Sequence, residues 1–418
     1  MQIGKPQLDA IVHALSIILP ARQPADVALR QFFREHKHLG QRDRGLIADT
    51  VYAALRRRRY LEHVTPEATP REMALAALVK VQSVGIGQIE SALRPAEKDW
   101  LVALKTDAGE DLPFNIRADL PDWVIERLRA GRSDEDILAL ARSFQQPAPL
   151  DLRVNALKAP REAVLERLER DDIAAEPTKY SPSGVRLRGK PALNQHVLFT
   201  EGVVEVQDEG SQLLGMLMEA RRGEMVVDFC AGAGGKTLQM GAAMGSQGRL
   251  YAFDVSDKRL TNLGPRLKRS GLSNVHPQRI ANENDAKVKR LRGKIDRVLV
   301  DAPCTGLGTL RRNPDLKWRQ TVEGIAELNV KQTAILDAAG ALVKPGGRLV
   351  YGTCSLLAEE NEQVVEAFLA KHPEFKLLSA QEILERAGVT LPGAGEYLHL
   401  YPHIHDTDGF FAAVMERQ

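Results

Sequence analysis

Cysteine, long hydrophobic runs and net charge are all scarce in this sequence. Its 418 residues include only three cysteines, which are too few for a disulfide framework. No Cys-x-x-Cys pair and no paired Cys/His spacing occurs, so no zinc or other metal site is predicted. A chain without disulfides is typical of the reducing cytosol, and we therefore expect a cytoplasmic location.

The hydrophobic runs are short. The longest apolar stretches, such as residues 73–79, are far too short to span a bilayer, so no membrane partner is expected. The first residues, Met-Gln-Ile-Gly-Lys-Pro, do not form a signal peptide. Apolar residues make up 44% and charged residues 27%, which is ordinary for a soluble globular protein. At about 150 residues per domain, the length predicts two or three domains.

The net charge of +2 says little about nucleic acid, but the cations are unevenly distributed. They gather in three clusters: Arg56 to Arg59; Lys287, Lys289, Arg290, Arg292 and Lys294; and Arg311, Arg312, Lys317 and Arg319. Any single cluster is most simply interpreted as a solvated helix face. The third follows Cys304 directly, and cations beside an active site suit a polyanionic substrate.

Hydrophobic spacing indicates two accessory regions before the last half of the chain. Residues 1–145 follow helical periodicity, and prolines divide the segment into short helices. After a Pro-rich boundary, strand-like alternation at 150–155 and 184–187 surrounds a helical pattern at 161–170. This predicts a small α+β unit over residues 146–204, which suits either RNA binding or a plain linker.

Strands and helices alternate from residue 205 to the end. The pattern predicts an α/β fold with a mostly parallel sheet that is covered by helices on both faces. The predicted strands are 225–229, 250–254, 297–301 and 348–351, and the clearest helices are 325–343 and 359–371.

A loop of small residues follows the first of these strands. It reads Cys230, Ala231, Gly232, Ala233, Gly234, Gly235 and Lys236. Small residues let the backbone approach a ligand closely, and the free N–H groups of the next helix suit a carboxylate or phosphate. The loop matches neither the phosphate-loop spacing nor the full dinucleotide fingerprint. A purely structural turn is the alternative, but the strand–loop–helix context favours cofactor binding by this loop.

Asp254 ends the second strand, roughly 20 residues past the loop, where an acid accepts hydrogen bonds from a ribose diol. Its alternative role is to cap the following helix. The combination with the loop favours a cofactor that carries a nucleoside. An amino-acid group over the helix N-terminus would make that cofactor S-adenosyl-L-methionine.

Two cysteines occupy equivalent positions after short β-type runs. Cys304 closes Asp-Ala-Pro-Cys and Cys354 lies in Gly-Thr-Cys-Ser, so two neighbouring strand ends are predicted to bring two thiols together. A thiolate is a strong nucleophile, although a buried and inert thiol is the usual alternative. Asp301 is either a turn aspartate or a carboxyl group that hydrogen-bonds the edge of a base. The pairing points to covalent chemistry on a base.

These motifs resemble the Sun/RsmB family of RNA (cytosine-5)-methyltransferases. The matching text is Val-Gln-Asp at 206–208, the glycine loop at 230–237, Asp-Ala-Pro-Cys-Thr-Gly at 301–306, Arg-Arg-Asn-Pro-Asp-Leu-Lys-Trp at 311–318, Gly-Thr-Cys-Ser at 352–355 and Asp-Gly-Phe-Phe at 408–411. The resemblance implies a helical NusB-like RNA-binding domain (1–145), a small α+β RNA-binding unit (146–204) and a Rossmann-like, doubly wound methyltransferase domain (205–418). It also implies a monomer that acts on RNA, most simply 16S ribosomal RNA.

The resemblance also implies a role for each residue. Cys354 would attack C6 of a cytosine, so that C5 accepts a methyl group from S-adenosylmethionine. Cys304 would assist proton removal from C5 and release of the covalent enzyme. Asp301 would bind N3 of the base and line the cofactor pocket, with Lys236 close to base or cofactor. The target base has to leave its stack to be reached.

Two departures from the family pattern stand out. Ala233 replaces the usual proline of the loop, and the residue expected to hold the adenine amino group is matched only by Asn282, in an irregular stretch. Three alternatives stay open: exchanged roles of the two cysteines, a transfer RNA substrate, and an RNA-binding assembly factor without catalysis. Methylation of a small molecule would leave the thiols and the accessory regions unexplained.

Overall fold

The computed structural model describes residues 2–106, 112–189 and 191–418. The chain forms two compact units. One unit, here called the helical unit, comprises Met1–Pro147 together with Thr309–Thr321. The other, here called the methyltransferase unit after the family that its sequence resembles, comprises Ala148–Gly308 and Val322–Gln418. No helix in these described ranges is long and apolar enough to cross a membrane.

The helical unit confirms the helical periodicity of the first part of the sequence. Its helices are α1 (Lys5–Ile18), α2 (Ala25–Glu35), α3 (Gln41–Arg56), α4 (Arg58–Val64), α5 (Pro70–Ala76), α6 (Ile86–Ile89), α7 (Pro95–Thr106), α8 (Phe114–Ala118), α9 (Asp122–Arg129) and α10 (Asp134–Phe144). Two of them begin at a proline, Pro70 and Pro95, because the missing N–H costs nothing in the first turn. Apolar side chains of α1, α3 and α5 form the centre of its core.

The segment 309–321 is a part of the helical unit, although the sequence pattern placed it in the methyltransferase domain. Its short helix α17 (Leu316–Arg319) carries Lys317, which is only 4% exposed. The Lys317 ammonium donates to the carbonyl of Arg56 at 3.0 Å and pairs with the buried Asp119 at 3.4 Å. Tertiary contacts of a buried lysine therefore tie this segment to the helices.

The third basic cluster is consequently not a set of free cations beside an active site, and that prediction is wrong. Arg311 is 6% exposed and donates to the carbonyl of Pro147 at 3.3 Å. Arg319 is half-buried and pairs with Asp315 at 3.0 Å. These cations form hydrogen bonds and ion pairs inside the helical unit. Long cationic side chains can bury their apolar stems when carbonyl or carboxylate groups bind the charged end.

The other two clusters behave differently from each other. In the first, the predicted solvated face is wrong, because its side chains are partly buried in ion pairs: Arg57 with Asp119, Arg58 with Glu62, and Arg59 with Asp122. In the second, the predicted solvated face is confirmed, since Lys287, Lys289, Arg290, Arg292 and Lys294 are all exposed.

The methyltransferase unit begins with a small antiparallel sheet in the order β2-β3-β1-β4. Its strands are β1 (Leu150–Val154), β2 (Ala175–Pro177), β3 (Gly184–Leu187) and β4 (Val204–Val206), and its helices are α11 (Arg161–Arg170) and α12 (Val197–Thr200). The strands and the helix predicted here are confirmed. Alternate strand residues such as Leu152, Val154 and Val185 pack against Val164 and Leu168 of α11.

The large sheet has the order β10-β12-β9-β8-β5-β6-β7, with β11 paired to β12. Its strands are β5 (Met225–Asp228), β6 (Arg249–Asp254), β7 (Val275–Arg279), β8 (Ile295–Asp301), β9 (Val343–Thr353), β10 (Phe375–Leu378), β11 (Leu398–Leu400) and β12 (Phe410–Arg417). The pairs among β5 to β9 are parallel, and those of β12 are antiparallel. The mostly parallel sheet predicted from the alternation is confirmed.

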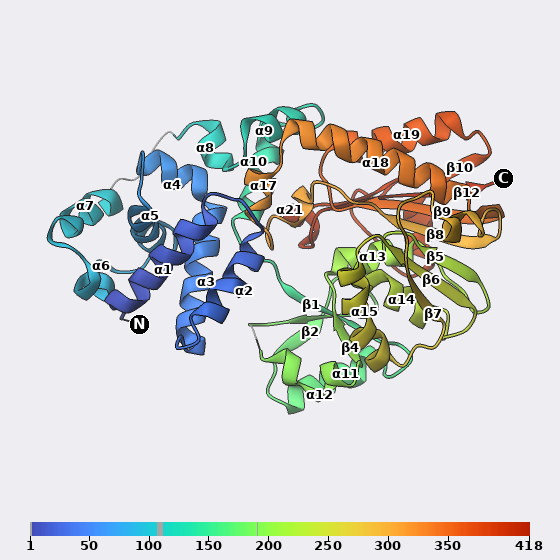
Figure 1. Ribbon diagram of the computed structural model, residues 1–418, viewed down its shortest axis with the longest axis horizontal. Coiled ribbons are helices and arrows are strands. Elements are labelled where there is room, and N and C mark those ends of the chain that lie inside the picture. Colours follow the sequence, from blue (N-terminus) through green and yellow to red (C-terminus); the bar gives the residue numbers. More distant parts are fainter. Residues whose placement is uncertain (1, 107–111, 190) are drawn as a thin grey trace. The chain divides into compact units, whose positions relative to one another are not determined.

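Helices cover both faces of this sheet, as Figure 1 shows. They are α13 (Glu209–Met216), α14 (Gly235–Ala243), α15 (Asp257–Ser270), α16 (Ala286–Lys289), α18 (Val322–Gly340), α19 (Glu362–Lys371), α20 (Ala380–Arg386) and α21 (Pro402–His405). Val226 faces the core under α13 and α14, whereas Val227 faces the core under α18 and α19. Both faces of the strands are buried, which explains why the sequences of these strands are continuous apolar runs.

Candidate active site

The strand order identifies where the large sheet should bind a ligand. β5 pairs with β6 on one side and with β8 on the other, so the chain reverses its direction of travel across the sheet at β5. Open parallel sheets bind ligands at such a point, beyond the carboxyl ends of the strands. The loops that follow β5 and β8 therefore face the same crevice, with the loop after β9 beside them.

A cavity of about 520 Å³ occupies this crevice. It is lined by most of the predicted site residues: Cys230, Ala231, Gly232, Ala233, Gly235, Lys236, Asp254, Asp301, Cys304 and Cys354. It is also lined by residues that the sequence pattern did not single out: Ser211, Asp228, Phe229, Val255, Arg259, Ile280, Glu283, Ala302, Pro303 and Ile335. One cavity thus joins the glycine loop to both cysteine loops.

The two predicted thiols meet at the mouths of adjacent strands. β8 and β9 run in parallel with Asp301 opposite Gly352, and Cys304 and Cys354 follow these residues in the two adjacent loops. Their sulfur atoms lie 3.4 Å apart, and both residues are partly exposed. This distance is within hydrogen-bonding range for sulfur, so the two side chains can share one proton.

The surroundings of Cys304 favour its protonated form. The hydrogen bond to Cys354, burial, and the negative charges of Cys354 and Glu360 raise the pKa of Cys304 well above its ordinary value. A thiol with a raised pKa is a poor resting nucleophile, but its thiolate is a strong base.

Lys236 and Asp301 form an ion pair inside the cavity. The ammonium lies 2.9 Å from the carboxylate, and it also lies over the ring of Phe410 at 5.3 Å from the ring centre. Burial acts to lower the pKa of Lys236, but Asp301 and, to a lesser extent, Cys354 raise it above the ordinary value. Lys236 is therefore a fixed positive charge that faces both Asp301 and Cys354.

Asp254 is bound to the glycine loop rather than to the helix that follows it. Its carboxylate accepts from the backbone N–H of Gly232 at 2.9 Å and from that of Ser256 at 2.7 Å. The capping residue of α15 is Ser256, whose hydroxyl accepts from the N–H of Arg259. The carboxylate of Asp254 lines the cavity, as the ribose-binding interpretation requires.

Gly234, which the sequence predicted as a cofactor-binding residue, packs against α15 at the back of the loop. It is absent from the lining residues and has a φ of 86°, in the left-handed region. A Cβ atom there would lie 2.1 Å from Cδ1 of Leu263. Glycine is needed at this position because the backbone turns sharply against α15.

Asp228 is the main functional candidate that the sequence pattern missed. One carboxylate oxygen accepts from the hydroxyl of Thr237 at 2.6 Å, and the other is buried without a hydrogen-bond partner in the described part of the chain. Burial, reinforced by the charges of Asp301 and Asp254, raises its pKa to about 7. The available signal was an acid at the end of an apolar strand, directly before a glycine loop.

Asn282 is not placed where its predicted role requires. Its side chain is exposed, and its amide oxygen accepts from the N–H of Asn284 at 2.9 Å. The neighbouring Glu283 lines the cavity instead. Strand or helix periodicity does not specify which side chains of the irregular loop after β7 face the cavity, so the sequence pattern did not distinguish Glu283 from Asn282.

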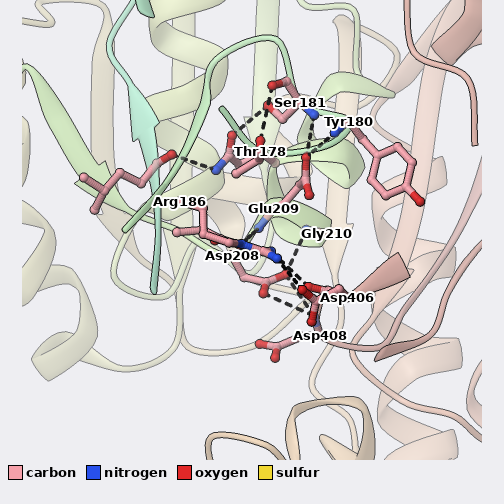
Figure 2. Close-up of polar contacts among 12 residues, drawn as sticks. Thr178, Tyr180, Ser181, Arg186, Asp208, Glu209, Gly210, Asp406 and Asp408 are labelled. Carbon is pink, nitrogen blue, oxygen red and sulfur yellow. Dashed lines mark hydrogen bonds and ion pairs between the residues drawn. The ribbon is translucent and has the colours of Figure 1, made fainter. Parts of the chain in front are cut away.

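The small sheet is fastened to the methyltransferase fold by acidic residues at the start of α13, as Figure 2 shows. Glu209 is fully buried and accepts from the N–H groups of Tyr180 and Ser181 at 2.6 and 2.7 Å. Asp208 caps α13 through the N–H of Gly210 and also accepts from the N–H of Asp408 at 3.1 Å. These contacts join the small sheet to the chain segment that enters β12.

A second contact crosses the same junction. Arg186 of β3 forms a bidentate pair with Asp151 at 2.7 and 3.0 Å, and its guanidinium also reaches Asp406 (Figure 2). The N–H of Gly409 then donates to the carbonyl of Gly308 at 2.8 Å. The small sheet is thus linked through a short chain of contacts to the loop that carries Cys304.

Comparison with protein families identifies both parts of this unit. Residues 215–416 match the family described as 16S rRNA methyltransferase RsmB/F. Residues 120–194 match the ferredoxin-like domain described as Methyltr_RsmF/B-like. The second match starts before α9, so it includes helices that pack in the helical unit of this structure.

Individual proteins with similar sequences and structures agree with this. The chain is 36% identical to the probable ribosomal RNA small subunit methyltransferase B of Synechocystis over 374 residues, which is 88% of this chain and 82% of that protein. It is 33% identical to ribosomal RNA small subunit methyltransferase B of Yersinia pseudotuberculosis over 350 residues, covering 84% and 77% of the two chains. The structure of a methyltransferase homolog protein from Pyrococcus horikoshii is 27% identical, with a TM-score of 0.62 over 73% of this chain and 98% of that chain.

Proposed function

Because the chain belongs to the RsmB/F family of 16S rRNA methyltransferases, we propose that it methylates C5 of a cytosine in 16S ribosomal RNA through a covalent cysteine adduct. The observation that carries the proposal is the pair of thiols 3.4 Å apart in the cavity that also contains the glycine loop. A single thiol suffices to form an adduct. A second thiol beside the first suits a reaction in which the covalent adduct must also be broken down.

The cavity fits S-adenosylmethionine, which supplies the methyl group. Gly232 and Gly235 leave open space where a side chain would stand, so the backbone can approach a ligand. Asp254 suits the ribose hydroxyls, and Glu283, which also lines the cavity, would accept a hydrogen bond from the adenine amino group. The unpartnered oxygen of Asp228 suits an ammonium group.

The charges of the site favour Cys354 as the nucleophile. The Lys236 ammonium faces Cys354, whereas the negative charge of Glu360 acts on Cys304. When the thiolate of Cys354 adds to C6, the displaced electron pair moves to N3, N3 takes up a proton, and C5 becomes an enamine-like carbon that can accept the methyl group. Asp301, held by Lys236, is positioned to accept a hydrogen bond from the protonated N3 of the base.

Cys304 resolves the adduct in this scheme. After methyl transfer Cys304 first gives up its own proton to solvent. Its thiolate then accepts the proton from C5, the C5–H electrons re-form the ring double bond, and the C6–S bond to Cys354 breaks, which releases that sulfur as a thiolate. The raised pKa of Cys304 suits this role, because it makes the thiolate a stronger base than an ordinary cysteine. We also propose that the protein is a cytoplasmic monomer and that the helical unit and the small sheet bind the RNA.

The test is to incubate the purified protein with 16S rRNA and S-adenosylmethionine and to map methylated cytosines by bisulfite sequencing. Adducts are detected as bands that survive denaturing electrophoresis. We expect Cys354→Ala to abolish both methylation and adduct, and Cys304→Ala to accumulate adduct. The double variant is the matched control, because it should form none.

Each rival has a distinct result in the same assays. If Cys354→Ala accumulates adduct and Cys304→Ala does not, the roles of the thiols are exchanged. Methylation of transfer RNA in place of 16S rRNA would show that the proposed substrate is wrong. An assembly factor without catalysis would bind RNA but show no heat of binding with S-adenosylmethionine in calorimetry.

A further inference from the structure

A buried carboxylate lies behind the thiols, outside the residues that line the cavity. Glu360, just before α19, is 0% exposed and forms no ion pair within the described part of the chain. A carboxylate in that position is costly unless several donors satisfy it. The groups that donate hydrogen bonds to Glu360 connect it to the two catalytic thiols.

Glu360 binds the residue that follows each catalytic cysteine. One carboxylate oxygen accepts from the backbone N–H of Thr305 at 2.9 Å. The other accepts from the hydroxyl of Thr305 at 2.5 Å and from the hydroxyl of Ser355. Thr305 follows Cys304 and Ser355 follows Cys354, so one side chain holds the loops after β8 and β9 together.

Gln332 and Asn361, which belong to the same network, hold the residue that precedes each cysteine. The amide of Gln332, on α18, donates to Glu360 at 3.0 Å and to the carbonyl of Pro303 at 2.9 Å. The side chain of Asn361 accepts from the hydroxyl of Thr353 at 2.5 Å. Its amide also donates to the carbonyl of Ser355 at 3.2 Å. Each cysteine is therefore flanked by two residues that this buried network fixes.

We propose that Glu360 is the positioning residue of the thiol pair: it sets the spacing of the two sulfurs and keeps their shared proton on Cys304. The inference rests on the proposed function, since it concerns the same two thiols. Its first part follows from the hydrogen bonds to both loops. Its second part follows from charge, because a buried anion beside one thiol opposes ionisation of that thiol.

The electrostatics of the site are consistent with this asymmetry. Glu360 contributes to the raised pKa of Cys304, along with the hydrogen bond to Cys354 and burial. On the opposite side, the Lys236 ammonium faces Cys354. The negative charge therefore acts on Cys304 and the positive charge acts on its partner sulfur, an arrangement that keeps the shared proton on Cys304.

The test separates charge from geometry with two variants and a control. Glu360→Gln keeps the size and lets the hydroxyls of Thr305 and Ser355 rotate to accept from the new amide, but it removes the charge. Glu360→Asp keeps the charge and shortens the reach. Glu366→Gln removes an exposed carboxylate from α19 and serves as the matched control.

The first readout is the pH profile of thiol alkylation, without RNA or cofactor. Each protein reacts with iodoacetamide over a range of pH, and mass spectrometry follows Cys304 and Cys354 separately. We expect Glu360→Gln to lower the alkylation midpoint of Cys304 by about one pH unit. Glu360→Asp should stay closer to the wild type, and Glu366→Gln should match it. A Glu360→Gln profile that superimposes on the wild type overturns the assignment of the proton.

The second readout is steady-state methylation. We expect Glu360→Gln and Glu360→Asp each to reduce kcat about 100-fold, with KM for S-adenosylmethionine changed less than about twofold, because the network does not touch the glycine loop. Unchanged kcat in both variants overturns the positioning role. If Glu360→Gln does not fold, Ser355→Ala is the substitute variant, because it removes one hydrogen-bond donor and keeps the charge of Glu360. We expect it to lower kcat and to leave the alkylation profile of Cys304 like that of the wild type. An unchanged kcat would count against the proposal.

Failure of the proposed function is distinguishable from failure of this inference. If the wild type does not methylate cytosine, the proposed function is wrong. The alkylation profiles still report whether Glu360 controls the proton of Cys304, because they require no substrate. If the wild type methylates and neither readout responds to Glu360, the inference alone is wrong.

Discussion

The carboxyl group of Asp228 should make stability and cofactor affinity depend on pH near neutrality. Asp228 lies at the carboxyl end of β5, is 1% exposed, and has one oxygen without a hydrogen-bond partner in the described ranges. Its pKa in the folded chain is raised to about 7 from an ordinary value of 3.8, chiefly by burial. The perturbation we consider is Asp228→Asn, which keeps the shape and cannot ionise.

The sign of the effect follows from proton binding. A carboxyl with a raised folded pKa holds its proton more tightly in the folded chain than in the unfolded one, so stability falls as pH rises from about 4 to about 7. The loss is about 1.4 kcal/mol per pH unit, so it reaches about 3 kcal/mol between pH 5 and 7 and then levels off. Asp228→Asn lacks this decline, and the difference in unfolding free energy between variant and wild type should therefore grow by about 3 kcal/mol from pH 5 to 8.

The assay is urea denaturation of both proteins at several pH values, with Asp257→Asn as the control because Asp257 is exposed in the first turn of α15. Using the difference between variant and wild type cancels the titration of all other groups. Calorimetry with S-adenosylmethionine adds a second measurement: binding to wild type should release a proton near pH 7, and binding to Asp228→Asn should not. A pH-independent difference in stability would refute the burial of an unpartnered carboxyl at this position.

Two further predictions concern packing. Lys317→Ala should lower the free energy of unfolding of the helical unit by about 3 kcal/mol, because among the described residues it leaves the fully buried Asp119 with Arg57, at 3.3 Å, as its one cationic partner. A loss below about 1 kcal/mol in denaturant unfolding would mean that Lys317 is solvated. Gly234→Ala should cost about 3 kcal/mol, from a left-handed φ of 86° plus a Cβ contact of 2.1 Å with Leu263. Gly293 has a φ of 65° but open space around its Cβ position, so Gly293→Ala should lower the free energy of unfolding by only about 1 kcal/mol. Equal losses of stability in the two variants would contradict the clash at Gly234.

The parts of the site that the sequence predicted correctly are those governed by local rules. Asp301 ends the apolar strand β8, Cys304 and Cys354 lie in the loops after β8 and β9, and Lys236 lies at the end of the glycine loop that follows β5. Parallel strands bring their carboxyl ends to one edge of the sheet, so all four residues line one cavity. The same rule located the glycine loop. Because these inferences need only strand type and chain order, the long-range contacts did not have to be known.

The parts that the sequence did not predict depend on tertiary contacts. The burial of Asp228 follows from the helices above the strand end, not from its neighbours in the chain. The segment 309–321 has the composition of an exposed basic loop, yet its lysine and arginine find carbonyl and carboxylate partners in the helical unit. Glu360 lies in the first turn of the helix predicted at 359–371, where an acidic residue is expected to be exposed to solvent, whereas the observed helix α19 begins at Glu362 and Glu360 is buried before it.

The position of Gly308 explains how the loop of Cys304 can stay ordered where the chain leaves the methyltransferase unit. Gly308 is the last residue before the segment that belongs to the helical unit. Its N–H donates to the carbonyl of Cys354 at 2.8 Å, and its carbonyl accepts from Gly409 at the same distance.

A side chain at Gly308 would not fit, since a Cβ atom would lie 2.1 Å from the carbonyl oxygen of Gly409. The chain is thus held on both sides at the point of exit, by the second cysteine loop and by the segment that Asp208 fixes through Asp408 (Figure 2). Displacements of the following segment are resisted at Gly308 before they reach Cys304. Glu360 holds Thr305 after Cys304, and Gln332 holds the carbonyl of Pro303 before it. With Gly308, these contacts fix the backbone on both sides of Cys304, as a thiol that must meet a partner 3.4 Å away requires.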